Sequence, residues 1–279
     1  MRKVLIPKGN GKTRLIYVPT GAQKKALRAL LPELTRRAQS ASLPGVMHGF
    51  VPGRSPVTNA RLHIGKAYTA TFDLKDFFDT VTEEHLPRLP VKILDQVLVE
   101  GSPRQGLPTS PAVANLAAAR LDRAIMRWLK RHGDRSAVYT RYADDLTLSC
   151  NDQETLQAAL AAIPELVRAA GFELAEAKTH VYDARAGRRI VTGVAVGEKD
   201  LAPTRRMKRR LRAAIHQGNT GEAEGLAEWC RLRLPRAERH QGRRPVLRGK
   251  ESAVSSGERR RTARRRIVLR QALSSSRPS

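Results

Sequence analysis

Two adjacent aspartates, Asp144 and Asp145, are the residues of this chain best suited to metal-dependent chemistry. They lie in the stretch VYTRYADDLTLS, residues 138–149, whose alternating β-branched and aromatic residues predict two short strands joined by a tight turn. Neighbouring carboxylates at a hairpin tip raise each other's pKa, so a divalent cation would stabilise the pair. Aspartate also favours turns because its side chain bonds the nearby backbone, and an ordinary turn is therefore the alternative interpretation of this stretch taken alone.

A third carboxylate, Asp73, ends another predicted strand. Residues 67–74, AYTATFDL, alternate strictly, which predicts a half-buried strand with Asp73 on the face turned away from the core. If this strand lies beside the 138–149 hairpin in one sheet, the three carboxylates meet on its open face. Such a set suits two divalent ions, as in phosphoryl-transfer enzymes, and magnesium is the hard ion that prefers carboxylate oxygens.

The elements that must position these carboxylates follow a recognisable order. From residue 67 onward the pattern is strand, helix, strand-turn-strand, helix, strand, which predicts an α+β fold of the split βαβ type with helices on one face of an antiparallel sheet. The first helix is predicted from Thr109 or Ser110 to about residue 131. Asn151 with Glu154 is expected to cap the second, and the later strands are predicted at 172–181 and 189–196.

The N-terminal segments are expected to form a strand pair followed by helices. Residues 1–19 predict the strand pair, with Lys12 and Arg14 at or near its turn, where they either meet a triphosphate or belong to a solvated turn. A helix is expected over residues 23–38, and Pro32 should kink or break it.

A loop rich in glycine and proline then leads into a helix expected to contain Asn59 and His63. These two residues are four positions apart and would share one helical face. Such a pair is more often structural than functional.

Composition indicates a polyanionic partner. The 279 residues include 52 Lys and Arg against 26 Asp and Glu, a net charge of +26, which favours nucleic acid over a membrane surface. The two cysteines match no disulfide or metal-ligand spacing, and no apolar run approaches a membrane span or a cleaved leader, so a cytoplasmic protein is expected.

Basic helices are expected over residues 204–233, and the remainder, dominated by Arg, Ser and Gly, is expected to be disordered. Two interpretations of this tail stay open. It is either a solvated tail or altered reading frame, or a non-specific RNA-binding arm.

Four motifs, in order, resemble the palm motifs of bacterial reverse transcriptases. They are DLKDFFDTV (73–81), QGLPTSPAVAN (105–115), YADD (142–145) and GFELAEAKT (171–179). Two further motifs resemble the retron subgroup, namely NARLH (59–63), similar to its N-A-x-x-H signature, and VTG (191–193), similar to its Val-Thr-Gly signature. Their combination is highly specific and the resemblance covers roughly residues 1–235.

The resemblance implies a right-hand polymerase with fingers, a βαββαβ-type palm carrying the YADD hairpin, and a small helical thumb. The expected boundaries are 1–66 for the fingers, 67–199 for the palm with finger insertions, 200–235 for a reduced thumb and 236–279 for the basic tail. The implied activity is RNA-directed DNA synthesis on a structured non-coding RNA. The implied cofactors and partners are two Mg²⁺ ions, deoxynucleotides, the cognate RNA with its cDNA, and a defence effector acting against phage.

The resemblance also implies roles for individual residues. Asp73, Asp144 and Asp145 would be the catalytic, metal-binding triad. The nucleotide-binding set would be Lys12, Arg14, Phe78, Gln105 and Lys178, with Phe78 excluding a 2′-hydroxyl. The RNA-recognition set would be Asn59, His63, Val191, Thr192 and Gly193.

The chain departs from the family pattern at three places, and two other functions stay open. Arg104 replaces the usual proline before Gln105, the span from Asp79 to Gly101 is short, and the thumb is reduced, which bears on processivity. One alternative is a group II intron-like or other defence-associated reverse transcriptase. The other is a catalytically weak RNA-binding protein that keeps the palm as a scaffold.

Overall fold

The structure is a computed structural model that describes residues 1–7, 11 and 13–233. Its elements in chain order are β1 (Arg2–Pro7), β2 (Thr13–Val18), α1 (Gly21–Ala41), α2 (Pro56–Arg61), β3 (Tyr68–Asp73), α3 (Phe77–Thr80), η1 (Glu83–His85), α4 (Val91–Val97), α5 (Ser110–His132), β4 (Val138–Tyr142), β5 (Asp145–Cys150), α6 (Gln153–Ala169), η2 (Glu176–Lys178), β6 (His180–Asp183), η3 (Ala184–Ala186), β7 (Arg189–Val191), β8 (Val194–Val196), β9 (Leu201–Pro203), α7 (Arg205–His216) and α8 (Thr220–Cys230). The tail predicted to be disordered lies outside the described residues.

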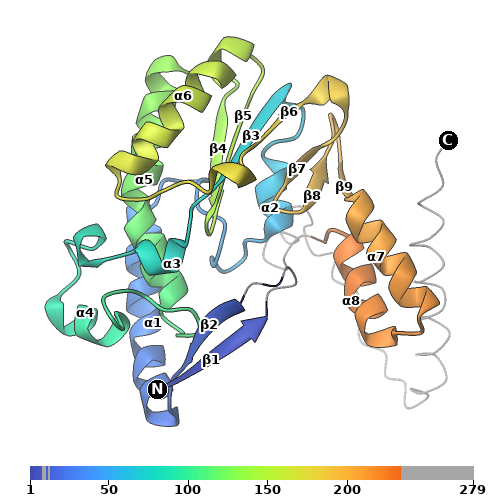
Figure 1. Ribbon diagram of the computed structural model, residues 1–279. Coiled ribbons are helices and arrows are strands. Elements are labelled where there is room, and N and C mark those ends of the chain that lie inside the picture. The colour runs from blue at the N-terminus through green and yellow to red at the C-terminus, as the bar shows by residue number, and fades with distance from the viewer. Residues whose placement is uncertain (8–10, 12, 234–279) are drawn as a thin grey trace, which may run out of the picture.

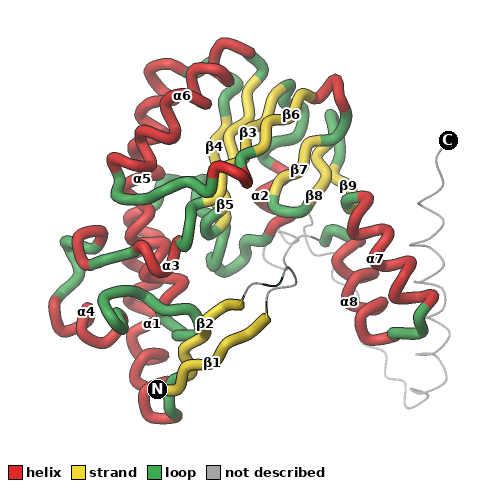
Figure 2. Tube along the Cα trace, viewed as in Figure 1, coloured by secondary structure: helices red, strands yellow, loops and turns green. Residues whose placement is uncertain are grey.

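A four-stranded antiparallel sheet of order β4-β5-β3-β6, called here the central sheet, organises the fold (Figure 1). The predicted strand at 67–74 and the predicted hairpin lie side by side, as expected, with β3 paired to β5 from Tyr68↔Cys150 to Asp73↔Asp145. One face of the central sheet packs on α5 and α6, and α1 packs on α5 (Figure 2). Because strand residues alternate between faces, Phe72, Leu146 and Leu148 fill the core under these helices.

The opposite face of the central sheet is more covered than its sequence pattern indicates. Thr69 was expected on a solvent face, but it is fully buried together with Ser149 and Thr140. The turn after α2 lies over these hydroxyls and places His63 among them. The helix predicted to contain both Asn59 and His63 therefore ends at Arg61, and His63 occupies the following turn.

A second sheet of order β7-β8-β9 stands beside the first, followed by the two helices α7 and α8 (Figure 1). The single strand predicted at 189–196 is a hairpin instead, because Thr192 and Gly193 adopt φ of 45° and 78°, the two positive values of a tight two-residue turn. The strand predicted at 172–181 overlaps β6 only at its last two residues, because β6 joins the central sheet over residues 180–183. The preceding residues turn through η2 after one bridge between Leu74 and Leu174.

Helix boundaries differ from expectation at three places. α1 runs uninterrupted through Pro32, because Leu27, Leu34 and Ala38 anchor the turns on either side of it in the core. α6 is capped by Asp152, whose side chain accepts from the Thr155 amide, and not by Asn151. Neither Thr109 nor Ser110 caps α5 through its side chain, since the Ser110 hydroxyl donates to the Arg104 carbonyl instead.

Within the part of the chain that the structure describes, no helix combines the length and apolar character needed to cross a bilayer.

Candidate active site

The three predicted catalytic aspartates lie together on the face of the central sheet turned away from α5. Asp73, the last residue of β3, stands opposite Asp145, the first residue of β5. Asp144 lies in the two-residue loop between β4 and β5, and its carbonyl accepts a hydrogen bond from the Leu74 amide at 3.0 Å. Strand register thus brings together carboxylates that are far apart in the chain, and each is half-buried.

These carboxylates carry more negative charge than their surroundings neutralise. Burial, followed by the nearby charges of Asp144 and Asp73, raises the pKa of Asp145 to about 7 against the opposing effect of Lys178. The pKa of Asp144 is also raised, first by burial and then by Asp73, while Lys178 and Arg14 lower it. The cluster is therefore an anionic site that favours a bound cation.

Lys178 supplies one such cation from within the chain. Its ammonium donates to the Asp73 carboxylate at 2.6 Å, although the lysine side chain is 63% exposed. The resemblance placed Lys178 among the nucleotide-binding residues. The structure places it on the carboxylate itself.

The donor chemistry of the three aspartates fits Mg²⁺, which takes carboxylate oxygens and keeps several waters. With the side chains as they lie, no group of three or more His, Cys, Asp or Glu among the described residues is gathered closely enough to hold a metal ion. In this arrangement one oxygen of the Asp73 carboxylate is bonded to the Lys178 ammonium.

A buried ion pair fixes the turn that carries Asp144. Arg141, on the core face of β4, has no exposed side-chain area and forks onto the Asp122 carboxylate of α5 at 2.9 Å from both Nε and Nη2. Its Nη1 donates to the Asn115 side chain and to the Ala143 carbonyl inside the turn. The turn is thereby tied to α5 through the core.

The turn itself is strained and closely packed. Ala143 has φ of 58°, a left-handed conformation that costs a residue with a Cβ on the order of 1–3 kcal/mol. Gly49 lies against it, and a Cβ on Gly49 would stand 2.2 Å from the Ala143 nitrogen. The Gly49 carbonyl accepts a hydrogen bond from the Asn115 side chain. Asn115 in turn bonds Arg141, so the hydrogen bonds of Arg141 hold both Ala143 and Gly49.

The predicted nucleotide-binding residues gather only in part. Arg14 is exposed on β2 and close enough to influence the pKa of Asp144. The Gln105 carbonyl accepts from the Tyr17 amide at 2.8 Å, which joins the 101–109 loop to β2. Lys12 lies outside the described residues.

Phe78 packs beside a second aromatic residue that the motifs did not indicate. The ring of Phe50 lies 6.0 Å from that of Phe78, centroid to centroid, and is 48% exposed. Phe50 also has a positive φ of 60°, a rare conformation for a bulky residue.

The predicted RNA-recognition residues separate into a buried and an accessible group. Asn59, His63 and Val191 have no exposed area, so the expected direct contact of these three with RNA conflicts with their burial. Burial lowers the pKa of His63 to about 3, and its neutral ring bonds Ser149 and Thr140, each at 2.8 Å. The Asn59 amide donates to Thr192 at 3.4 Å.

Thr192 and Gly193 remain accessible and line a cavity of about 270 Å³ with the aspartates. Asp73, Asp145 and Lys178 contribute polar groups to it from the central sheet and η2. The hydroxyl of Thr192 donates to the Pro56 carbonyl, so α2 holds the hairpin turn at the edge of this cavity.

Arg104, which departs from the family pattern, closes the short span that precedes it. Its guanidinium pairs with Asp79 at 2.7 Å and donates to the carbonyls of Val99 and Glu100. Its 17% exposed side chain also lies over the Tyr17 ring at 5.7 Å. Arg104 and the short span from Asp79 to Gly101 therefore form one feature, a compact loop closed by an arginine.

Comparison with known proteins places the chain in a family. Residues 6–188 match the protein family described as reverse transcriptase (RNA-dependent DNA polymerase). The chain is 34% identical to the retron Mx65 reverse transcriptase of Myxococcus xanthus, covering 88% of this chain and 64% of that protein. It is 35% identical to the retron Mx162 reverse transcriptase of the same organism, covering 78% and 52%. The chain thus spans about half to two thirds of the length of these relatives.

Solved structures of polymerases share the fold. The telomerase of Candida albicans, in complex with a fragment of telomeric RNA, superposes with a TM-score of 0.56 at 11% identity, over 82% of this chain and 52% of that one. A foamy viral protease-reverse transcriptase in complex with an RNA/DNA hybrid gives 0.51 at 14% identity, over 96% and 33%. The predicted α+β polymerase fold is confirmed.

The raised pKa of Asp145 predicts an unusual dependence of stability on pH. An unfolded aspartate has a pKa of about 3.9, so between about pH 4 and pH 7 the folded protein holds a proton that the unfolded chain has released. This contribution to stability is complete below about pH 4 and is lost as the pH rises to about 7. Asp145→Asn cannot ionise and should melt several degrees above wild type at pH 8 in EDTA.

At pH 4.5 the Asp145→Asn variant and wild type should melt together. The exposed Asp95→Asn is the matched control and should show no pH-dependent difference from wild type. Circular dichroism melts at both pH values make the comparison, and an Asp145→Asn variant no more stable than wild type at pH 8 contradicts it.

The Arg141–Asp122 pair predicts a second effect on stability. Arg141→Met leaves a buried carboxylate unpaired and should lower the free energy of unfolding by about 3–5 kcal/mol. The double variant Arg141→Met/Asp122→Leu should regain much of this loss, because apolar side chains replace both charges. Tyr139→Phe, which removes one hydrogen bond to Asp122, should lower the free energy of unfolding by only about 1 kcal/mol. Urea titrations of all these variants measure the free energy of unfolding. If Arg141→Met lowers the free energy of unfolding no more than Tyr139→Phe does, the Arg141–Asp122 pair does not hold the turn in place.

Proposed function

Because the chain belongs to the reverse transcriptase (RNA-dependent DNA polymerase) family, we propose that it is an RNA-directed DNA polymerase of the retron type. The observation that carries this proposal is the convergence of Asp73, Asp144 and Asp145 at one end of the central sheet, opposite its helical layer. The relatives named retron reverse transcriptases support the type. In this proposal the fingers, palm, thumb and tail follow the boundaries predicted above.

The proposed chemistry uses the three aspartates as magnesium ligands. When bound, two Mg²⁺ ions supply positive charge to the attacking and leaving oxygens of nucleotidyl transfer. Asp145 and Asp144 gain most from such charge, because their raised pKa values report uncompensated burial. The Lys178 ammonium holds Asp73 in the absence of that charge and would release its carboxylate for ligation.

The neighbouring residues would receive the deoxynucleotide. Arg14, together with Lys12, is proposed to bind the triphosphate from the β1–β2 hairpin, and Gln105 to lie along the nucleotide. Phe78 is proposed to close the space beneath the sugar, where its ring is supported by Phe50 and Phe77.

The cognate template is proposed to be a structured non-coding RNA that remains with its cDNA product and acts with a partner effector in defence against phage. Among the predicted recognition residues, Thr192 and Gly193 are the ones positioned to touch RNA, because they line the same cavity as Asp73 and Asp145. Asn59 and His63 would act through them, by holding the hairpin against α2 and the central sheet.

The central test is loss of the carboxylate charge. Asp144→Asn and Asp145→Asn should each reduce magnesium-dependent DNA synthesis on a primed RNA template by on the order of a thousandfold, since the ligands stabilise transition-state charge. RNA binding, measured by gel shift, should stay near wild type because the metal ions are needed for transition-state charge and not to hold the RNA backbone. Asp95→Asn serves as the control. Activity within about tenfold of wild type in both variants would remove the catalytic assignment.

Sugar selection gives an independent test. Phe78→Ala should admit ribonucleotides, because a steric filter disappears with the volume of its ring. Incorporation of ribonucleotides relative to deoxynucleotides should rise at least about tenfold, whereas Phe77→Leu, which changes the buried neighbour, should leave the ratio near wild type. Unchanged discrimination in Phe78→Ala would assign the filter to another residue.

The retron type is tested by the nucleic acid that the protein carries. Sequencing the RNA and DNA that co-purify with the chain should recover one abundant structured RNA joined to a short cDNA. A random collection of cellular RNA would instead favour a scaffold protein, and an intron RNA would favour the group II-like alternative.

A further inference from the structure

The outer face of α5 carries a row of cations that the proposed catalytic chemistry does not use. Arg120, Arg123, Arg127 and Lys130 follow one another at spacings of three and four residues, and all are exposed. At about 100° per residue they lie nearly opposite the buried side of α5, which contacts the central sheet through Asp122. We call these four residues the α5 basic row.

The charges of the α5 basic row are not neutralised by ion pairs in the part of the chain that the structure describes. None of its four residues takes part in a salt bridge within residues 1–7, 11 and 13–233, and the one carboxylate of α5, Asp122, is paired with Arg141. α1 and α6 each contain one internal ion pair, Glu33–Arg37 and Glu165–Arg168, whereas α5 has none for its exposed cations. Like charges at these spacings repel one another and destabilise a helix, so a bound anionic partner would remove this destabilisation.

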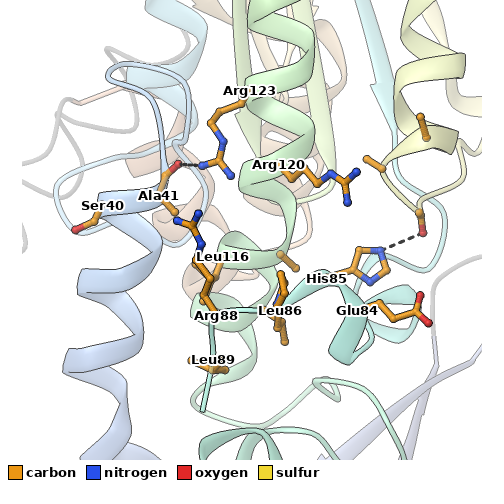
Figure 3. Close-up of a pocket in the computed structure, with 15 residues that line it drawn as sticks. Ser40, Ala41, Glu84, His85, Leu86, Arg88, Leu89, Leu116, Arg120 and Arg123 are labelled. Carbon is orange, nitrogen blue, oxygen red and sulfur yellow. Dashed lines mark hydrogen bonds between the residues drawn. The ribbon is translucent and has the colours of Figure 1, made fainter. Parts of the chain in front are cut away.

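The surface along the row is hollowed. One cavity of about 510 Å³ is lined by Arg120 and Arg123 together with Arg88 from the loop after η1 (Figure 3). A second cavity of about 500 Å³ continues past Arg123 to Arg127 and Lys130. Arg123 lines both, and it is held between them by a hydrogen bond of 2.6 Å to the Ala41 carbonyl, drawn as a dashed line in Figure 3.

The acidic groups at these cavities are few. Glu84 lines the first cavity on the far side from Arg123 (Figure 3). Asp134 lines the second, but its carboxylate accepts from the backbone amides of Ser136 and Asp152. The guanidinium groups therefore define the chemistry of the groove, and planar forks of this kind match phosphate oxygens.

The groove offers phosphate contacts without a platform for bases. The row runs from residue 120 to residue 130, about 15 Å of helix, which is long enough to reach several successive phosphates of one strand. Among the described residues, neither cavity is lined by Phe, Tyr or Trp. The one aromatic ring of the described chain at the first cavity, His85, packs on Phe172 with 4.6 Å between ring centroids, and Trp128 packs on His132 at 5.2 Å. Unpaired bases usually stack on exposed aromatic rings, whereas a duplex keeps its bases inside and presents its backbone.

We infer that the α5 basic row binds the phosphate backbone of a base-paired RNA segment. This inference rests on the proposed function in that RNA is the partner, and it names a surface separate from the aspartates. The row lies on the far side of the central sheet from Asp73 and Asp145. A folded RNA bound there would contact the protein on the face opposite the one where its other segment is copied.

The test measures binding and not synthesis. The triple variant Arg120→Gln/Arg123→Gln/Arg127→Gln keeps helix-favouring side chains while removing three charges. Its matched control is Lys24→Gln/Lys25→Gln/Arg28→Gln, which removes three exposed cations from the first turns of α1. The probe is a fluorescent RNA hairpin of arbitrary sequence with a stem of about twenty base pairs, titrated by anisotropy from low to high KCl without nucleotides or divalent ions.

The α5 triple variant should bind the hairpin at least tenfold more weakly, and its plot of log K against log [KCl] should be shallower by about 2–3, near 0.9 for each phosphate that the protein no longer neutralises. The control triple should change affinity less than threefold. Equal losses in the two triples, or no loss in the α5 triple, would overturn the inference, since the row would then add only to the overall charge. An equal loss on single-stranded oligouridylate would overturn the preference for paired RNA.

Two further measurements keep the outcome clear. If the α5 triple variant melts well below wild type by circular dichroism, the single variant Arg127→Gln is titrated in its place. Its plot of log K against log [KCl] should be shallower than that of wild type by about 0.9. Asp95→Asn, which changes one exposed carboxylate outside the row and the aspartate site, should bind the hairpin as tightly as wild type. A failure of the α5 surface is thereby distinguished from a failure of the proposed polymerase, which the synthesis assay tests on its own.

Discussion

The buried pair of Arg141 and Asp122 is the interaction on which the rest of the site depends. It joins the hairpin of the central sheet to α5 through the core, and its guanidinium also reaches the Ala143 carbonyl. Two charges with no exposure are costly to bury, and they persist where their hydrogen bonds are complete. Here the guanidinium of Arg141 donates hydrogen bonds to the Asp122 carboxylate, to the Asn115 side-chain oxygen and to the Ala143 carbonyl. An otherwise unfavourable conformation at Ala143 is thereby held in one position.

The central sheet separates two kinds of chemistry by the alternation of its strands. One face is apolar except for Arg141 and its partners, and it packs on the helices. The other begins with a layer of hydroxyl groups bonded to neutral His63 and ends with the aspartates. Charge is thus concentrated at one end of an otherwise uncharged face. Burial and mutual repulsion at that end outweigh the opposing charge of Lys178, which explains why the pKa values of Asp144 and Asp145 rise.

The sequence predicted the parts of this structure that depend on short-range pattern. Alternation located β3 and the β4–β5 hairpin, and their pairing brought Asp73 to Asp145 as expected. It did not indicate Arg141, because a single charged residue in a strand reads as solvent-facing until its partner on α5 is known. The sequence did not indicate the burial of Thr69 and Asn59 for the same reason, since the segments that cover them come from elsewhere in the chain. Pro32 shows the converse, where packing on α5 overrides a local helix breaker. The site was therefore predictable in its carboxylates and unpredictable in the residues that hold them.

The attachment of the second sheet has a mechanical consequence. Within the described chain, its strands share no ladder with the central sheet, and Val191, Val194 and Val196 pack instead on Ala60 of α2 and Trp229 of α8. The C-terminal helix pair and the turn at Thr192 are therefore coupled through one apolar cluster. A displacement of α8 would therefore be felt at the turn that carries Thr192, on the edge of the aspartate cavity, unless the hydrogen bonds from Asn59 and to the Pro56 carbonyl hold that turn on α2.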